Sequence, residues 1–223
     1  MSTSLAHARL IVFDIDGTLL ATDAFWLDVG RRAVAAVYAR HGVTRELPED
    51  RRFLDAIGYP MEMFWNHVLP DDLRALGPEV EAEAESLEEG AFASGLGALY
   101  PGARRLLEDL RAAGRRVGLA SNCSRRYLHA FIGAFGLAPL LDSAKCADDP
   151  GMRSKSDMLA EIFAETGTRE AVMIGDRDSD RQGAKGQRIP FVLFTGGFSG
   201  TAPADGDHVA TDYAALRRML LPD

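Results

Sequence analysis

Short apolar runs alternate with helical patterns along most of the chain. The runs RLIVF at residues 9–13, RVGLA at 116–120, AVMI at 171–174 and PFVLF at 190–194 have no polar face, which is typical of strands covered on both sides of a parallel sheet. Segments with apolar residues at helical spacing separate these runs. This alternation predicts βαβ units, and therefore an α/β fold with a Rossmann-like parallel sheet.

One long stretch interrupts the alternation. After the first run, apolar residues recur at helical spacing as far as Gly42, and residues 49–97 continue as helix-like pieces without a convincing strand. We therefore predict two domains, an α/β core formed by residues 1–20 and 98–223 and an inserted α-helical cap domain at 21–97. The acidic stretch EVEAEAESLEEG of this insertion is interpreted as a solvated helix face. Its aromatic residues are interpreted as core rather than as substrate contacts: Phe25, Trp26, Phe64 and Trp65.

Charge and composition narrow the function classes. The 223 residues include 25 Lys and Arg against 33 Asp and Glu, a formal charge of −8, so nucleic acid and anionic membranes are repelled on average. Two cysteines are too few for a disulfide framework. The N-terminus lacks the pattern of a secretory signal, and no apolar run reaches the roughly 18 residues of a membrane span. We expect a cytoplasmic protein that binds neither nucleic acid nor membrane.

Polar side chains gather where the predicted strands end. DIDGT follows the first strand, Ser121 and Asn122 follow the second, GDRDSD follows the third, and Lys155 lies in the first turn of a predicted helix. Ligands of α/β proteins bind beyond the carboxyl ends of parallel strands. An Asp-Gly pair is also typical of a hairpin, but the first run lacks the polar face that a hairpin strand would need.

These groups together suit phosphoryl transfer through a covalent intermediate. Asp14 and Asp16 are two residues apart, so on an extended chain their side chains point the same way, and one could attack phosphorus while the other moves a proton. Two carboxylates repel a phosphate, so a cation is needed, and Mg²⁺ with oxygen ligands, one of them from Asp176, is the usual solution. Three further residues would hold the phosphate by charge or hydrogen bonds: Lys155, Ser121 and Asn122.

The order of these motifs resembles the haloacid dehalogenase superfamily of phosphohydrolases over nearly the whole chain. Asp-x-Asp-Gly-Thr after an apolar strand occurs in LIVFDIDGTLL, a strand ending in Ser in VGLASN, a lysine opening a helix in RSKSDMLAEIF, and Gly-Asp-x-x-x-Asp in VMIGDRDSD. The segment LYPGARRLLEDLRAAG also resembles the phosphoglycolate-phosphatase-like branch. Members with a helical block between the first two motifs carry it as a cap over the site.

The resemblance implies a role for each matched residue. Asp14 is then the nucleophile, and Asp16 is the general acid that later activates water. Mg²⁺ would be held by Asp14, by the backbone carbonyl of Asp16 and by Asp176. Asp180 and Thr18 would support these ligands from behind.

The sequence therefore predicts a Mg²⁺-dependent phosphatase that acts on a small phosphorylated metabolite. Two positions depart from the branch: Ser156-Asp157-Met158 follows Lys155 where many members have Pro-x-Pro, and Cys123 occupies a position that is often lysine. These two departures argue against phosphoglycolate as the substrate. Two other functions stay open, a phosphosugar mutase and a regulator that binds a phosphorylated ligand without turnover.

Other interpretations of the same motifs are disfavoured. A phosphonate hydrolase would need a cap lysine, and residues 21–97 contain none. A dehalogenase would not need Asp16 to protonate its leaving group. A calcium loop beginning at Asp176 would need Gly at its sixth position and Glu at its twelfth, where this chain has Arg181 and Gln187. Lys145 is the alternative to Lys155 as the lysine that holds phosphate.

Overall fold

A six-stranded parallel sheet forms the centre of the structure, which is a computed structural model that describes residues 5–59 and 61–221. The strand order is β3-β2-β1-β4-β5-β6. The strands are β1 (Leu10–Phe13), β2 (Arg116–Ser121), β3 (Ser143–Cys146), β4 (Ala171–Gly175), β5 (Phe191–Phe194) and β6 (His208–Ala210). Every neighbouring pair is parallel, so the carboxyl ends of all six strands lie along one edge. The predicted fold class is confirmed.

Both faces of β1 are buried, as its unbroken apolar sequence predicts. Leu10 and Val12 belong to an apolar cluster with residues of α7 (Lys155–Thr166), while Ile11 and Phe13 point into the larger cluster on the other face. The period of two along a strand explains this division. β1 is thereby fixed between β2 and β4, and Asp14 follows directly at its carboxyl end.

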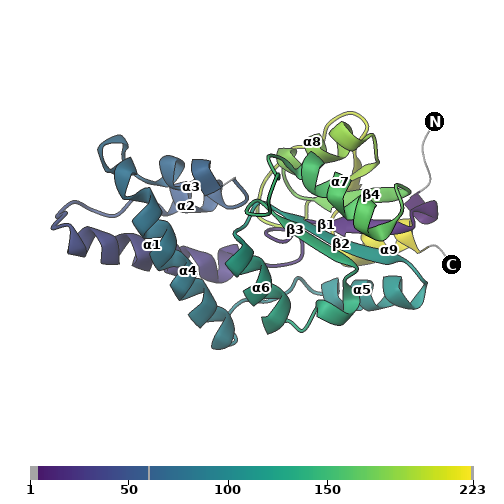
Figure 1. The fold of residues 1–223 in the computed structure, drawn as a ribbon, viewed down its shortest axis with the longest axis horizontal. Helices are drawn as coiled ribbons and strands as arrows, with labels where there is room; N and C mark the ends of the chain where they lie inside the picture. The colour runs from purple at the N-terminus through teal and green to yellow at the C-terminus, as the bar shows by residue number, and fades with distance from the viewer. Residues whose placement is uncertain (1–4, 60, 222–223) are drawn as a thin grey trace.

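Helices cover the two faces of the sheet. On one face lie α7 and α8 (Asp178–Gln187), which pack on each other and on β2 to β5 (Figure 1). The other face is covered by α5 (Ala103–Ala112) and α9 (Tyr213–Leu220), and α6 (Arg125–Ala134) follows β2. Short 3₁₀ turns occur at Leu5–His7 and Ala138–Leu140. The sheet is therefore the middle layer of three.

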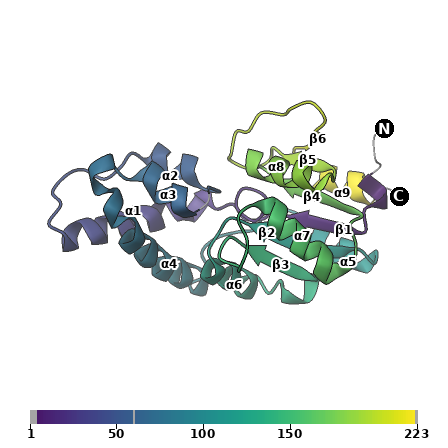
Figure 2. The same ribbon diagram turned by 45° about the horizontal axis from the view of Figure 1, so that its top comes forward.

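A helical region is inserted between β1 and β2. It contains α1 (Asp23–Arg40), α2 (Asp50–Ala56), α3 (Met61–Val68), a 3₁₀ segment (Asp71–Leu76) and α4 (Gly77–Ala93). Two views show it beside the carboxyl ends of the strands, with α4 reaching α6 (Figures 1 and 2). No strand occurs among the described residues of this region, as predicted. Residue 60 of the predicted cap, and residues 1–4 and 222–223 of the predicted core, lie outside the described part.

The inserted region joins the sheet domain through two adjacent chain segments. The backbone N–H of Ala21 donates to the carbonyl of Ala98 at 3.0 Å, and that of Tyr100 donates to the carbonyl of Leu19 at 2.9 Å. Leu20 and Leu99 form an antiparallel bridge between these bonds. The outgoing and returning chains are thus tied together where the insertion begins and ends.

The sequence predicted four of the six strands, and the two that it missed are the edge strands β3 and β6. β3 contains Ser143 and the half-buried Lys145, and β6 has three residues of which Val209 is exposed. An edge strand has a neighbour on one side alone and is often short and polar, so it lacks a long apolar run. Among the described residues, none of the helices is both long and apolar enough to cross a bilayer.

Candidate active site

The loop after β1 turns sharply against the loop after β4. The N–H of Asp14 still donates to the carbonyl of Ile174 at 2.9 Å, so Asp14 continues the strand beside β4. Gly17 has φ +79°, and a Cβ at this position would lie 2.2 Å from Oδ2 of Asp176. A side chain is excluded both by the backbone conformation and by this close approach. The glycine of the motif therefore lets the two aspartate loops touch.

Lys155 is positioned by the start of α7. The hydroxyl of Ser154 caps this helix by accepting a hydrogen bond from the N–H of Asp157 at 3.3 Å. Lys155 is 4% exposed, and its Nζ donates to Oδ1 of Asp14 at 2.5 Å and also to Oδ1 of Asp180. Lys145, the alternative lysine, pairs instead with Glu165 on the outside of the sheet.

Three buried carboxylates meet beside this lysine. Oxygen atoms of Asp14, Asp176 and Asp180 lie within 4.8 Å of one another. Neither carboxylate oxygen of Asp176 has a hydrogen-bond partner among the described residues, although the Nε of Arg177 is 3.8 Å from Oδ2. One ammonium does not balance three buried carboxylates, and clustered oxygen ligands suit Mg²⁺. The residues present therefore fit a divalent cation.

Burial and mutual repulsion shift the titration of this cluster. Burial raises the pKa of Asp14 well above its ordinary value, and nearby Lys155 opposes that shift. Burial and the neighbouring Asp180 raise the pKa of Asp176 to about 7. Burial lowers the pKa of Lys155, but its ion pairs with Asp14 and Asp180 raise it by more, so it stays charged. A bound cation would favour the ionised form of each carboxylate.

Asp16 faces away from the cluster, toward the inserted region. Its Oδ1 accepts hydrogen bonds from the hydroxyl of Thr22 at 2.6 Å and from that of Tyr127 at 2.7 Å. Burial raises the pKa of Asp16, and these two hydrogen bonds oppose the shift. Sequence analysis missed both partners. Thr22 lies six residues after Asp16 and outside the motif, and Tyr127 comes from α6, which the fold alone brings to Asp16.

Ser121 and Asn122 lie at the carboxyl end of β2, and both are buried. The Oγ of Ser121 accepts a hydrogen bond from the N–H of Cys123 at 3.3 Å. The Nδ2 of Asn122 donates to the carbonyl of Gly58 in the inserted region at 3.0 Å. Thr18 is also buried, and its Oγ1 has no hydrogen-bond partner among the described residues.

The loop after β5, residues 195–200, supports the Asp176 loop. The hydroxyl of Ser199 donates to the backbone carbonyl of Asp176 at 2.5 Å. Gly197 lies so close to Gly17 that a Cβ there would be 2.0 Å from the Gly17 carbonyl oxygen. Neither contact has a signal in the sequence, because each depends on loops brought together by the sheet.

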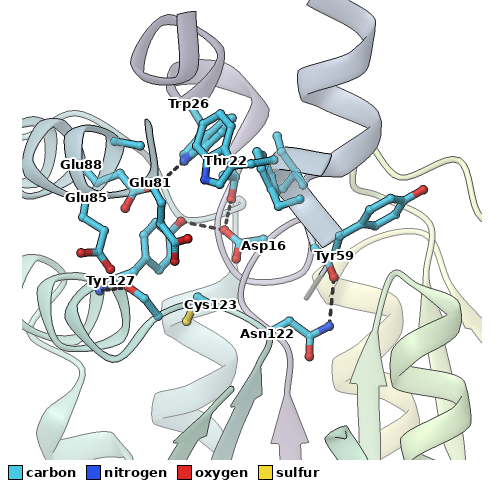
Figure 3. A pocket seen from close by; sticks show the side chains of 16 residues that line it. Asp16, Thr22, Trp26, Tyr59, Glu81, Glu85, Glu88, Asn122, Cys123 and Tyr127 are labelled. Atoms are coloured by element: carbon cyan, nitrogen blue, oxygen red, sulfur yellow. Dashed lines mark hydrogen bonds between the residues drawn. The ribbon is translucent and has the colours of Figure 1, made fainter. Parts of the chain in front are cut away.

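A cavity of about 50 Å³ lies between Asp16 and the inserted region (Figure 3). Asn122, Cys123 and Tyr127 line it from the sheet domain, and residues of α1, α3 and α4 line it from the insertion. Trp26, Phe64 and Trp65 are buried, as expected of core residues, but they also line this cavity. A larger groove of about 560 Å³ reaches Lys155 and Asn122 from α7 and α8.

The acidic stretch of the insertion differs from its interpretation as a solvated face. It forms much of α4, on which Glu79 and Glu89 are exposed, but Glu88 is only 8% exposed. The Nε1 of Trp26 donates to Oε1 of Glu88 at 2.5 Å. Because α4 packs on both α1 and α6, the face of the helix that carries Glu88 is shielded from solvent. Acidic composition alone cannot reveal this packing.

Two curated relatives are 29% identical to this chain. Tyrosine-protein kinase PtkA of Mycobacterium bovis matches over 198 residues, which are 85% of this chain and 63% of that protein. Phosphoglycolate phosphatase of Pseudomonas putida matches over 235 aligned residues, covering 95% of this chain and 78% of that protein. This chain thus spans less than two thirds of the length of PtkA.

Solved structures and family models give a consistent result. A structure from Lactobacillus plantarum, whose protein is described as a phosphoglycolate phosphatase, superimposes with a TM-score of 0.80 at 20% identity and covers 95% of this chain and 99% of its own. At that identity the likeness concerns the fold. The family model of haloacid dehalogenase-like hydrolases matches residues 8–187, which include all four motifs and most of the sheet. The chain belongs to the haloacid dehalogenase-like hydrolase family.

Proposed function

We propose that the protein is a Mg²⁺-dependent phosphatase that hydrolyses a small phosphate monoester through an aspartyl phosphate on Asp14. The observation that carries this proposal is the buried cluster in which Lys155 contacts Asp14 and Asp180 while both oxygens of Asp176 lack a hydrogen-bond partner among the described residues. The negative charge of these buried carboxylates exceeds the positive charge of Lys155. A bound cation would balance the charge, and the cluster could then hold a phosphoryl group.

In the first half of the reaction, a carboxylate oxygen of Asp14 attacks phosphorus, and the bond between phosphorus and the ester oxygen breaks. Asp16 gives its proton to that departing oxygen. Lys155 contacts Asp14 at 2.5 Å, so it orients the nucleophile and attracts the phosphoryl oxygens. Thr22 and Tyr127 fix the carboxyl of Asp16 in place during the proton transfer.

In the second half, Asp16 takes a proton from water, whose oxygen attacks phosphorus and releases Asp14 and inorganic phosphate. Mg²⁺, when bound, would neutralise charge on the phosphoryl group and the carboxylates. Asp14, the backbone carbonyl of Asp16 and Asp176 are the ligands we propose. Asp180 would support them, because it already accepts hydrogen bonds from Lys155 and from the N–H of Arg177.

We further infer that residues 21–97 act as a cap on a core formed by residues 1–20 and 98–223. The paired segments at Leu20 and Leu99 join the two parts, and the Asn122–Gly58 hydrogen bond closes the cap onto the core. Ser121 and Asn122 would donate to phosphoryl oxygens when substrate is bound. A closed cap would keep water from the phosphorylated aspartate until the leaving group departs.

Hydrolysis of p-nitrophenyl phosphate tests this proposal. We expect phosphate release that a chelator abolishes and Mg²⁺ restores, and that Asp14→Asn lowers at least about 10³-fold, because the variant lacks the attacking charge. Asp178→Asn is the matched control, since Asp178 lies in the same acidic motif but is exposed and pairs with Arg181. Circular dichroism checks that both variants fold.

The result also separates the other two functions. A phosphosugar mutase would become phosphorylated on Asp14 but release little phosphate, and a non-catalytic regulator would bind without either event. Full activity of Asp14→Asn would contradict the assigned nucleophile.

A further inference from the structure

The cavity beside Asp16 is lined by carboxylates. Its charged lining residues, among those that the structure describes, are all acidic: Asp16, Glu81, Glu85 and Glu88. No lysine, arginine or histidine of the described chain lines it. Arg177 approaches from behind, with its Nε 3.4 Å from where a Cβ of Gly58 would be, and Arg126 pairs with Glu85 and Glu89. A negatively charged group in this cavity would therefore face carboxylates without a lining cation.

The helical repeat of α4 brings these carboxylates together. Glu81, Glu85 and Glu88 are four and three residues apart, so they share one face of the helix. Figure 3 shows the three side chains together on the side of the cavity opposite Asn122 and Tyr59. Among the described residues, no lysine or arginine pairs with Glu81 or Glu88. The main contact of Glu88 is the hydrogen bond from Trp26 at 2.5 Å.

Aromatic rings form much of the remaining wall, and five of them line the cavity: Trp26, Tyr59, Phe64, Trp65 and Tyr127. Trp26 and Phe64 meet edge to face with ring centroids 4.8 Å apart, and Phe64 and Trp65 likewise at 4.9 Å. The Nε1 of Trp65 is buried without a hydrogen-bond partner among the described residues. Aromatic faces beside carboxylates are the usual surroundings of a bound organic cation.

The leaving group of the substrate must occupy this cavity if Asp16 is the acid that protonates the departing oxygen. That oxygen has to lie within hydrogen-bond reach of the Asp16 carboxyl, and the cavity begins at Asp16 and ends at α4. We propose that this leaving group is a short alcohol carrying a cationic ammonium, held between the α4 carboxylates and the aromatic rings. This inference rests on the proposed phosphatase function, and it disfavours a leaving group with a carboxylate.

Two further properties of the cavity agree with a small cation. Its volume of about 50 Å³ suits a chain of few atoms. Burial, together with nearby Asp16, Glu85 and Glu81, raises the pKa of Glu88 to about 8, while the hydrogen bond from Trp26 lowers it. An ammonium beside Glu88 would favour its ionised form.

A series of three esters of similar size tests the proposal: 2-aminoethyl phosphate, propyl phosphate and 2-phosphoglycolate. With Mg²⁺ present, we expect kcat/KM for the aminoethyl ester to exceed that for the isosteric propyl ester at least 10-fold, and phosphoglycolate to be slower than both. Equal rates, or a preference for phosphoglycolate, would overturn the inference. If p-nitrophenyl phosphate is hydrolysed while the aminoethyl ester is not, the inference fails and the phosphatase function stands.

Binding of the product alcohol provides a readout that needs no turnover. Both tryptophans of the chain, Trp26 and Trp65, line the cavity, so their fluorescence reports occupancy directly. We expect ethanolamine to change the emission at concentrations at least 10-fold below those at which 1-propanol does. If both alcohols changed the emission at the same concentration, the proposal would be contradicted. This result would count even if the protein hydrolysed none of the three esters.

The variant Glu88→Gln tests the role of the carboxylate, since glutamine keeps the size and an oxygen that can accept from Trp26. We expect it to reduce the ratio of kcat/KM between the aminoethyl and propyl esters at least about five-fold. Glu161→Gln, on the exposed side of α7, is the matched control and should keep the ratio. An unchanged ratio in a folded Glu88→Gln protein would count against the proposal.

Discussion

Glu88 should make the stability of the protein depend on pH. Burial raises its pKa from 4.5 to about 8, so between these values the folded state holds a proton that the unfolded state releases. The free energy of unfolding therefore falls as pH rises across this window. The full pKa shift corresponds to a change of about 5 kcal/mol in the free energy of unfolding. Because the structure around a buried charge relaxes, we expect a smaller change of roughly 1–3 kcal/mol.

Glu88→Gln removes this titrating group. We expect urea unfolding to show the variant gaining roughly 1–3 kcal/mol over the natural protein between pH 5 and pH 8. Both proteins are measured at the same Mg²⁺ concentration, so that metal binding to the aspartate cluster contributes equally to their stability. The exposed Glu161→Gln protein should follow the natural one at each pH, and an identical decline in the Glu88 variant would contradict the assignment.

The polar residues of the candidate site were predictable from the sequence, whereas their hydrogen-bond partners were not. Asp14, Lys155 and Asp176 follow motifs at strand and helix ends, so each could be named without coordinates. The hydrogen bonds of Thr22 and Tyr127 to Asp16 were not predictable, because α6 and the start of the insertion meet only in the fold. A charge in an acidic run is ordinarily solvated, which is why the burial of one glutamate was missed.

The N-terminus of α7 links helix stability to the site. Ser154 caps the helix, and the next residue is Lys155, whose side chain reaches Asp14 and Asp180. Ser154→Ala removes the capping acceptor and should cost about 1 kcal/mol of unfolding free energy. Because Lys155 lies in the first turn, fraying there should also lower kcat for p-nitrophenyl phosphate several-fold.

The helix α9 offers a matched control for that prediction. Asp212 caps it by accepting from the N–H of Ala215 at 2.7 Å. The residue that follows this cap, Tyr213, donates to the backbone carbonyl of Thr18 and bonds neither Asp14 nor Asp180. Asp212→Ala should lose a similar unfolding free energy, measured by urea titration, while keeping its kcat. Equal losses of kcat in the two variants would show that activity follows general stability rather than the position of Lys155.

The central strands of the sheet were predictable from the sequence, and the edge strands were not. β1, β2, β4 and β5 have strand neighbours on both sides and layers on both faces, so their sequences are continuous apolar runs. β3 and β6 lack a second neighbour and carry polar or exposed residues. The insertion was recognisable because it contains no such run across many residues, whereas the packing of its helices depends on contacts that no local pattern contains.

The arrangement of sheet and insertion concentrates negative charge at one place. Three buried carboxylates meet at the carboxyl ends of β1 and β4, and the acidic face of α4 closes over the adjacent cavity. Lys155 is the one lysine bonded to this cluster among the described residues. Repulsion between the carboxylates should therefore destabilise the metal-free protein, and a divalent cation should relieve it.

Mg²⁺ should consequently raise the melting temperature of the protein, because the proposed site exists in the folded state and not in the unfolded chain. At 100 times the dissociation constant the gain is about 2.7 kcal/mol, which for a chain of this size corresponds to roughly 5–10 °C. Differential scanning calorimetry with Mg²⁺ and with a chelator measures the shift. Asp176→Asn should lose most of it, since Asp176 provides the two unpartnered oxygens.

Asp178→Asn serves again as the control and should respond to Mg²⁺ like the natural protein, because Asp178 is exposed at the start of α8. In the absence of metal, Asp176→Asn should melt at or above the temperature of the natural protein, since it removes one of three clustered buried charges. A full Mg²⁺ shift in Asp176→Asn would mean that the cation binds elsewhere, and the cluster would then be a strained polar core rather than a metal site.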